Sequence, residues 1–293
     1  MGDTEGTPSN STLLRWAMLI VVVANLAFIA VYSGPGKSPT LAEVVAVYGN
    51  TFVPAGFVKA VSAPILVAFV SFYLVALWPG NRRRRIYDAL VVPHALTSLM
   101  ASIWIVAFRN EAIGISVAAV AASVALGGVM FVRVASASPS RYSTWLRVPF
   151  SLYFGTMTIA LLISVTQWLN ASEVLAQTAM VPDDVATAFL AIAAAMGGYV
   201  ALRYSDFIYP AVITMGVGAM YIAQRTYDPN VAADALAVGI GMLVVAGLAA
   251  IALAHQPRRD PNARTSHRRK RYARSTQDDW ENPLDANTSI MRI

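Results

Sequence analysis

The stretch 52-FVPAGFVKAVSAPILVAF-69 begins a long apolar segment, yet it contains Pro54, Pro64 and the charged Lys59. A proline at a helix start loses nothing, because its missing N–H would have no intrahelical partner there. Pro54 fits that position, and Gly56 allows the preceding loop to approach closely. Pro64 lies inside the segment and predicts a kink, which membrane helices tolerate where a neighbouring helix or a cavity satisfies the freed carbonyl. Irregular packing and a ligand cavity are therefore the two explanations of this segment.

The composition predicts an integral membrane protein. The 293 residues are 57% hydrophobic and 13% charged, with a mean hydropathy of +0.55, whereas soluble domains carry roughly 25% charged residues. The absence of cysteine excludes disulfides, thiolate metal sites and cysteine catalysis. The net charge of +6 lies in short clusters between apolar runs and in the C-terminal tail, which argues against nucleic acid as a partner.

The apolar runs predict about eight membrane spans, since a bilayer core requires about 20 apolar residues per helix. The runs fall at residues 13–32, 53–78, 86–108, 112–134, 148–170, 184–204, 207–225 and 231–254. The predicted fold is all-α, a polytopic transmembrane helical bundle. We expect a polar leader at 1–12, a five-helix membrane core at 13–170, a three-helix membrane extension at 171–254, and a basic then acidic tail at 255–293 that is too polar to form a core.

Lysine and arginine residues predict the orientation, because cytoplasmic loops are enriched in them. Four consecutive arginines, 82–85, follow the second span, three more follow the fourth, and the tail is strongly basic. The alternate loops contain only Lys37, Arg109 and Arg225. Both termini are therefore expected in the cytoplasm, and the basic tail either orients the chain or contacts anionic lipid.

Three stretches resemble the translocator-protein family, also called tryptophan-rich sensory proteins (TspO/MBR), and in particular its longer bacterial branch. The run 52-FVPAGFV-58 is similar to FTPAGYV at the start of that family's second helix. The run 103-IWI-105, followed by Glu111, is similar to the end of its third helix, and 147-RVPFSLYFG-155 is similar to the start of its fifth. The resemblance covers about residues 10–170 and implies a five-helix bundle in a bacterial inner (plasma) membrane, with a pocket that opens toward the loop between the first two helices.

The resemblance also implies a tetrapyrrole- or isoprenoid-like hydrophobic ligand that is sensed or transported. The candidate ligand-binding residues are Pro54, Ala55, Gly56, Phe57, Ser62, His94, Trp104, Tyr153 and Thr156. Where the family has aromatic or amide side chains, this chain has smaller groups at Ser62, Leu66, Ala101, Thr156 and Ser164. These departures remove rings that would stack on a planar ligand.

Ionisable residues at membrane depth suggest function by default, and His94 in the third span is one. It either contacts a ligand or relays a proton, or it is a neutral histidine hydrogen-bonded to a neighbouring helix. Asp88 lies six residues earlier, a spacing that does not place the two side chains on one helical face.

The remaining features have structural explanations. Aromatic residues near the span ends predict an interfacial belt; they are Tyr73, Trp78, Tyr87, Trp145 and Trp168. Asp206, close to Arg203, predicts an interfacial charge pair. Glycines in four spans predict close helix packing, and those in the last two spans are candidates for a homodimer interface.

These observations favour a receptor or carrier over an enzyme, because the candidate residues include no paired nucleophile and base. No metal site or cofactor is expected, and the expected partners are a hydrophobic small molecule and the lipid bilayer. The alternatives are a secondary transporter, for which Pro64 and Pro210 would mark broken helices, and a non-catalytic structural subunit of a membrane complex.

Overall fold

The computed structural model describes residues 8–32, 44, 57–81, 85–137, 141–172, 182–226 and 228–255. Within these ranges, the side chains at 8–11, 30, 57–60, 62, 141–144 and 182 are not described. The chain divides into two compact units, Met1–Ala254 and His255–Ile293. The predicted tail lies outside the described residues, apart from His255.

The described chain is helical, and the predicted all-α fold is confirmed. The helices are α1 (Pro8–Tyr32), α3 (Phe57–Leu77), η1 (Pro79–Asn81, a short 3-10 helix), α4 (Arg85–Arg109), α5 (Ile113–Ala137), α6 (Arg141–Ala171), α8 (Pro182–Tyr204), α9 (Ile208–Gln224) and α10 (Pro229–His255). Each of the eight apolar runs forms one α-helix. Six of them are long and apolar enough to cross a membrane, whereas α3 and α9 offer the shorter apolar stretches Ala63–Leu77 and Ile208–Gln224.

Local chemistry sets several helix boundaries. α10 begins at Pro229, and the Asp228 carboxylate accepts hydrogen bonds from the N–H groups of Asn230 and Val231, at 3.2 Å each, as expected of a capping residue. α4 ends in a tight turn where Glu111 has a φ of 58°, the left-handed conformation that commonly ends helices. α3 continues through Pro64 as a single helix.

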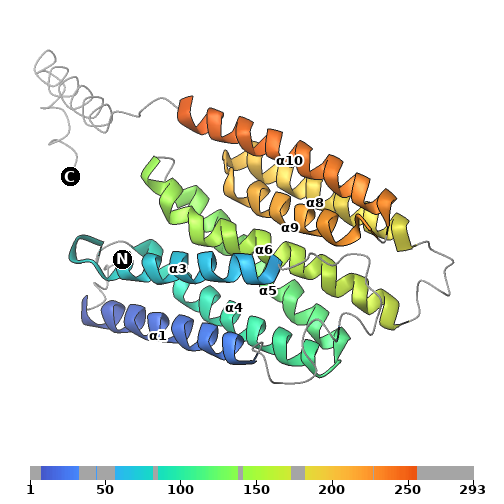
Figure 1. The fold of residues 1–293 in the computed structure, drawn as a ribbon. Helices are drawn as coiled ribbons and strands as arrows, with labels where there is room; N and C mark the ends of the chain where they lie inside the picture. Colours follow the sequence, from blue (N-terminus) through green and yellow to red (C-terminus); the bar gives the residue numbers. More distant parts are fainter. Residues whose placement is uncertain are drawn as a thin grey trace, which may run out of the picture. The chain divides into compact units, whose positions relative to one another are not determined.

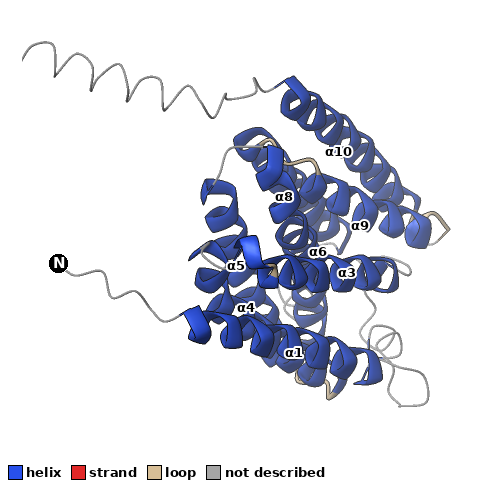
Figure 2. Ribbon diagram, turned by 90° about the vertical axis from the view of Figure 1, so that its left-hand side faces the viewer, coloured by secondary structure: helices blue, strands red, loops and turns tan. Residues whose placement is uncertain are grey.

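Five helices close into a ring. α1 packs on α3 and α4, α4 on α5, α5 on α6, and α6 on α3, so the sequence of contacts returns to its start (Figures 1 and 2). Successive helices run in opposite directions. We call the end that holds the α4–α5 turn, residues 110–112, the turn end, and the end that holds η1 the opposite end.

The last three helices lie on the outer side of α6. α9 packs on α6 and α8, and α10 contacts this pair, since a Cβ added at Gly197 of α8 would lie 2.6 Å from the Met242 Sδ of α10. α6 is therefore central to the described helices: 67% of its span is buried, compared with 17% to 39% for the other five long apolar helices.

Close backbone approach joins α6 to α9. A Cβ added at Gly155 would lie 3.0 Å from the Val212 Cβ, and one added at Gly216 would lie 2.9 Å from the Ile159 Cγ1. The prediction of close packing at glycines is thus confirmed at Gly216, where a larger residue would hold the helices apart, whereas Gly198, Gly218 and Gly241 have open space beside them.

The predicted interfacial charge pair between Asp206 and Arg203 is not present. The Asp206 carboxylate is buried, accepts the N–H groups of Ile208 and Tyr209 at 2.9 Å each, and accepts the Ser151 hydroxyl at 2.7 Å. The first N–H groups of α9 have no intrahelical partner, and this carboxylate accepts two of them. Arg203 lies instead over the Tyr204 ring.

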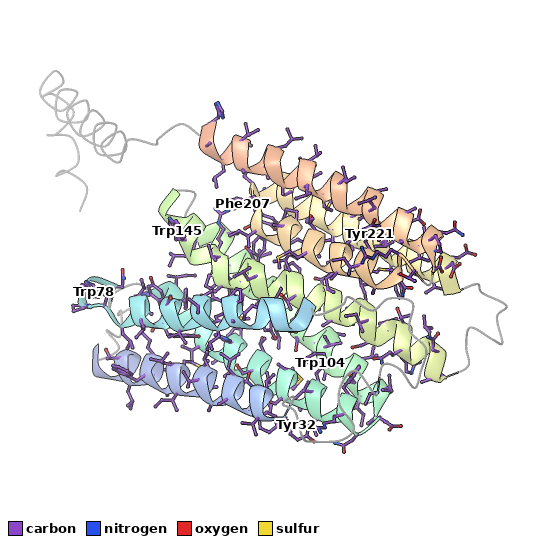
Figure 3. All side chains as sticks on the ribbon, in the orientation of Figure 1. Tyr32, Trp78, Trp104, Trp145, Phe207 and Tyr221 are labelled. Carbon is purple, nitrogen blue, oxygen red and sulfur yellow. The ribbon has the colours of Figure 1, made fainter. Side chains whose placement is uncertain are left out.

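The aromatic belt is present only in part. Trp78 and Trp145 are exposed at the opposite end (Figure 3), as an interfacial position requires. Tyr73 and Tyr87 are fully buried, so the belt interpretation was wrong for them. They pack inside the bundle, where the Tyr73 hydroxyl lies 2.7 Å from the His94 Nδ1 and the Tyr87 ring faces the Arg15 guanidinium.

Candidate functional site

The candidate site is the inside of the five-helix ring, and one face of α6 lines it along its length. Residues spaced three or four apart on a helix share a face, and this face carries Tyr153, Thr156, Ala160, Ser164 and Gln167. All five side chains are buried. The opposite face of α6 carries Ser151, Gly155 and Ile159, which contact α9 and the turn before it.

Contacts with three other helices show that the first face points into the ring. The Trp104 Nε1 of α4 donates to the Ser164 Oγ at 3.3 Å. The Tyr153 ring lies edge-on to Phe69 of α3, with ring centroids 5.8 Å apart. A Cβ added at Gly127 of α5 would lie 3.3 Å from the same tyrosine ring.

Toward the opposite end, aromatic side chains fill the space between the five helices. Phe69 contacts His94 with centroids 4.2 Å apart, and Phe72 contacts Phe150 at 5.0 Å and Tyr87 at 5.2 Å. Edge-on and tilted pairs of this kind are the favoured geometries of aromatic rings and stabilise a core. We infer that this half of the bundle serves as a packed core.

His94 belongs to this core. It is 3% exposed, and its Nδ1 lies 2.7 Å from the Tyr73 hydroxyl of α3. Of the two interpretations given by the sequence, the structure favours a histidine hydrogen-bonded to a neighbouring helix. Asp88 lies elsewhere and pairs with Arg15, which agrees with the prediction that Asp88 and His94 form no dyad.

The half of the ring toward the turn end is different in chemistry. Besides apolar residues such as Val61, Ile65, Ile105, Phe108 and Val120, it buries a group of small or neutral polar side chains: Thr97, Ser98, Ala101, Ser116, Thr156, Ala160, Ser164 and Gln167. Trp104 of α4 lies in this half (Figure 3), next to Phe108 with ring centroids 6.2 Å apart. Among the described residues, the Thr97 Oγ1, the Ser116 Oγ and both amide atoms of Gln167 are buried without a hydrogen-bond partner.

The turn end is closed in part by Val44. This residue lies between α1 and α3 in the chain and packs with Phe108 and Ile113 at the α4–α5 turn. Arg109 lies at the same end, where its guanidinium donates to the Tyr32 carbonyl and lies over the Tyr32 ring, 5.1 Å from its centroid. A cation at the last carbonyls of α1 is favourable, because the helix dipole is negative there.

The predicted site residues fall into three groups. Pro54, Ala55 and Gly56 lie outside the described residues, and Phe57 and Ser62 are placed on α3 without their side chains. Trp104, Tyr153 and Thr156 lie inside the ring, although the Thr156 hydroxyl donates to the Leu152 carbonyl of its own helix at 2.8 Å. His94 also lies inside the ring, in the packed aromatic half.

The sequence analysis missed three polar residues inside apolar helices, two of them buried and one, Asn25, half-buried. Arg15 of α1 is 1% exposed and donates to the carbonyls of Ala76 and Asn81. Asn25 donates to the Ser98 carbonyl at 2.8 Å and to the Ser102 hydroxyl at 2.6 Å. Gln167 is 0% exposed. Each interrupts an apolar run, and polar residues within a membrane span are a signal that was available in the sequence.

Chemically, the turn-end half offers apolar surface and neutral hydrogen-bonding groups. Among the residues that the structure describes, no three His, Asp or Glu side chains gather as a metal site would require. The side chains near Trp104 can therefore bind and orient a molecule through shape and hydrogen bonds.

Comparison with protein families matches residues 13–252 to the family described as TSPO-like protein. The match runs past residue 170, where the resemblance of the three sequence motifs ends, and it includes α8, α9 and most of α10. No curated protein and no solved structure matches the chain.

Proposed function

The chain belongs to the TSPO-like family, and on this premise we propose that it is a non-enzymatic membrane receptor or carrier. It binds a small hydrophobic molecule inside the five-helix ring, toward the turn end, and serves in sensing or transport. Both termini lie on the cytoplasmic side of a plasma membrane. Because α1 begins at the opposite end of the bundle, the turn end then faces the outside of the cell.

The contrast between the two halves of the ring carries this proposal. Toward the opposite end, rings in direct contact fill the interior, as in an ordinary core. Toward the turn end, α6 presents small and hydroxylic side chains opposite Trp104, and several buried polar atoms have no partner among the described residues. Buried polar groups are normally satisfied. Thr97, Ser116 and Gln167 are therefore the groups of this half to which a bound molecule would supply partners.

Binding by the purified protein in lipid nanodiscs tests the proposal. We expect saturable binding, with one molecule per chain, of at least one member of a panel consisting of a porphyrin, a sterol and a retinoid. Trp104→Phe should weaken that binding about fivefold, because it removes aromatic contact area and the indole donor.

Trp145→Phe is the matched control, since Trp145 is 79% exposed at the opposite end. The Trp145→Phe protein should bind the same ligand with the affinity of the unaltered protein. The absence of saturable binding for the whole panel, or equal effects of the two tryptophan substitutions, would contradict the proposed site.

A further inference from the structure

Gln167 is the buried polar side chain that the packing of the described chain leaves least satisfied. It is 0% exposed, and neither its Nε2 nor its Oε1 has a hydrogen-bond partner among the described residues. An amide buried in this way loses its hydration without compensation, which is unfavourable. Such a residue needs a partner that the described helices do not supply.

The position of Gln167 points to the ring interior. It follows Ser164 by three residues on the face of α6 that contacts α3, α4 and α5. It lies four residues before the end of α6 at Ala171, and Ser116 is the fourth residue of α5. Since α5 and α6 are antiparallel and packed together, both polar side chains lie about one turn inside the turn end.

A primary amide has a distinctive chemistry, because it donates through Nε2 and accepts through Oε1. A guest that satisfies both atoms must bring an acceptor and a donor at the same place. A hydroxyl group does so with one oxygen. A carboxylate or an ether brings acceptors only, and would leave the Oε1 unpaired.

Charge argues in the same direction. Arg109, the arginine of α4 at this end, is already engaged by the Tyr32 carbonyl and ring. An anionic head group beside Gln167 would therefore lose its hydration without gaining this cation as a partner. The other buried groups at this level, among them Ser116, are neutral.

We propose that Gln167 is the head-group anchor of the site, and that the guest is an uncharged, largely apolar molecule with one hydroxyl group that lies against this amide. This assignment rests on the proposed function. The apolar body of the guest packs beside the Trp104 side chain, whose Nε1 donates to the Ser164 Oγ, and stops short of the packed aromatic half. The anchored hydroxyl accepts a hydrogen bond from Nε2 and donates its own to Oε1.

Three retinoids with one polyene body test the assignment: retinol, its methyl ether and retinoate. We expect the protein in nanodiscs to bind retinol about tenfold more tightly than the ether or the anion. Gln167→Leu should remove this preference by weakening retinol binding about tenfold while leaving ether binding within about twofold. Gln224→Leu is the matched control, because Gln224 is a buried glutamine on α9, outside the ring, and it should retain the preference.

The outcomes separate the two proposals. If none of the three retinoids binds, the anchor assignment is wrong, and the pocket is wrong as well if the porphyrin and the sterol also fail to bind. If they bind but retinoate or the ether equals retinol in the unaltered protein, the pocket stands and the anchor is wrong, and this comparison needs no variant. If Gln167→Leu lowers thermal stability while the retinol preference persists, the amide serves the protein's own backbone, and the anchor is again wrong.

Discussion

At the scale of single residues, Arg15 shows how a cation is held inside an apolar helix. Its Nε lies 2.8 Å from the Asp88 Oδ1, and its Nη1 donates to the Ala76 carbonyl at 2.7 Å and the Asn81 carbonyl at 3.1 Å. The guanidinium also lies 5.3 Å from the Tyr87 ring centroid. One side chain of α1 thereby satisfies the end of α3, the following η1 turn and the start of α4, which a planar five-donor group is suited to do.

Arg15→Met should lower the free energy of unfolding by about 2 kcal/mol, because it leaves Asp88 and two carbonyls without their donor. The Asp88 side chain is 33% exposed, so water compensates part of the loss. Reversible unfolding in mixed micelles measures the change. Arg133→Met is the control: Arg133 is exposed and donates to the Ala89 carbonyl at 3.0 Å, and its loss should change the free energy by less than about 0.5 kcal/mol. Equal changes in the free energy of unfolding for the two variants would show that the buried contacts of Arg15 do not stabilise the protein.

The residue scale also marks the limit of what the sequence predicts about the site. Trp104 and Tyr153 were predicted from motifs, and both lie on inward faces of the ring. Gln167 and Arg15 were not predicted, because their importance depends on which helices surround them. A single helix shows a polar residue in an apolar run, whereas burial and lack of a partner arise only when several helices pack.

At the scale of helices, hydrophobic length predicted each element, because a membrane span must satisfy its backbone internally and is therefore helical. The packing of α6 was not predicted. One face is buried in the ring and the other against α9, so apolar and small residues occur all round it and its sequence shows no dominant face. Periodicity identifies a buried face only where another face is exposed.

The α6–α9 contact gives a prediction at this scale. Gly155→Ala should destabilise the protein by about 1–3 kcal/mol, since the new methyl group would lie 3.0 Å from both the Cβ and Cγ1 of Val212 and 3.4 Å from the Tyr209 carbonyl. The β-branched Val212 has little rotamer freedom with which to yield. Thermal unfolding in detergent measures the effect.

Gly218→Ala, on α9, is the matched control for this prediction. A Cβ at Gly218 would meet nothing within 4 Å. This substitution should therefore leave the midpoint temperature of thermal unfolding unchanged or raise it slightly, because alanine favours the helical conformation. A Gly155→Ala protein as stable as Gly218→Ala would mean that the two helices do not approach as closely as described.

At the scale of the whole molecule, the arrangement of the spans depends on α9. Its 17 residues extend about 26 Å at 1.5 Å per residue, slightly less than the roughly 30 Å of a bilayer core. Its contacts with α6 and α8 cover one side of it, and a short span is tolerated by local thinning of the bilayer. We therefore expect α9 to cross the membrane, which keeps both termini on one side.

Single cysteines test this topology directly, because the chain contains none of its own. A membrane-impermeant maleimide should label Asn110→Cys in the α4–α5 turn and Thr226→Cys between α9 and α10 in intact cells, since both positions are exposed at the turn end. Ser275→Cys in the basic tail should react only after permeabilisation, because positive segments remain in the cytoplasm. Labelling of Asn110→Cys but not Thr226→Cys would show that α9 does not cross the membrane. If instead only Ser275→Cys is labelled in intact cells, the turn end of the bundle, where Gln167 lies, faces the cytoplasm.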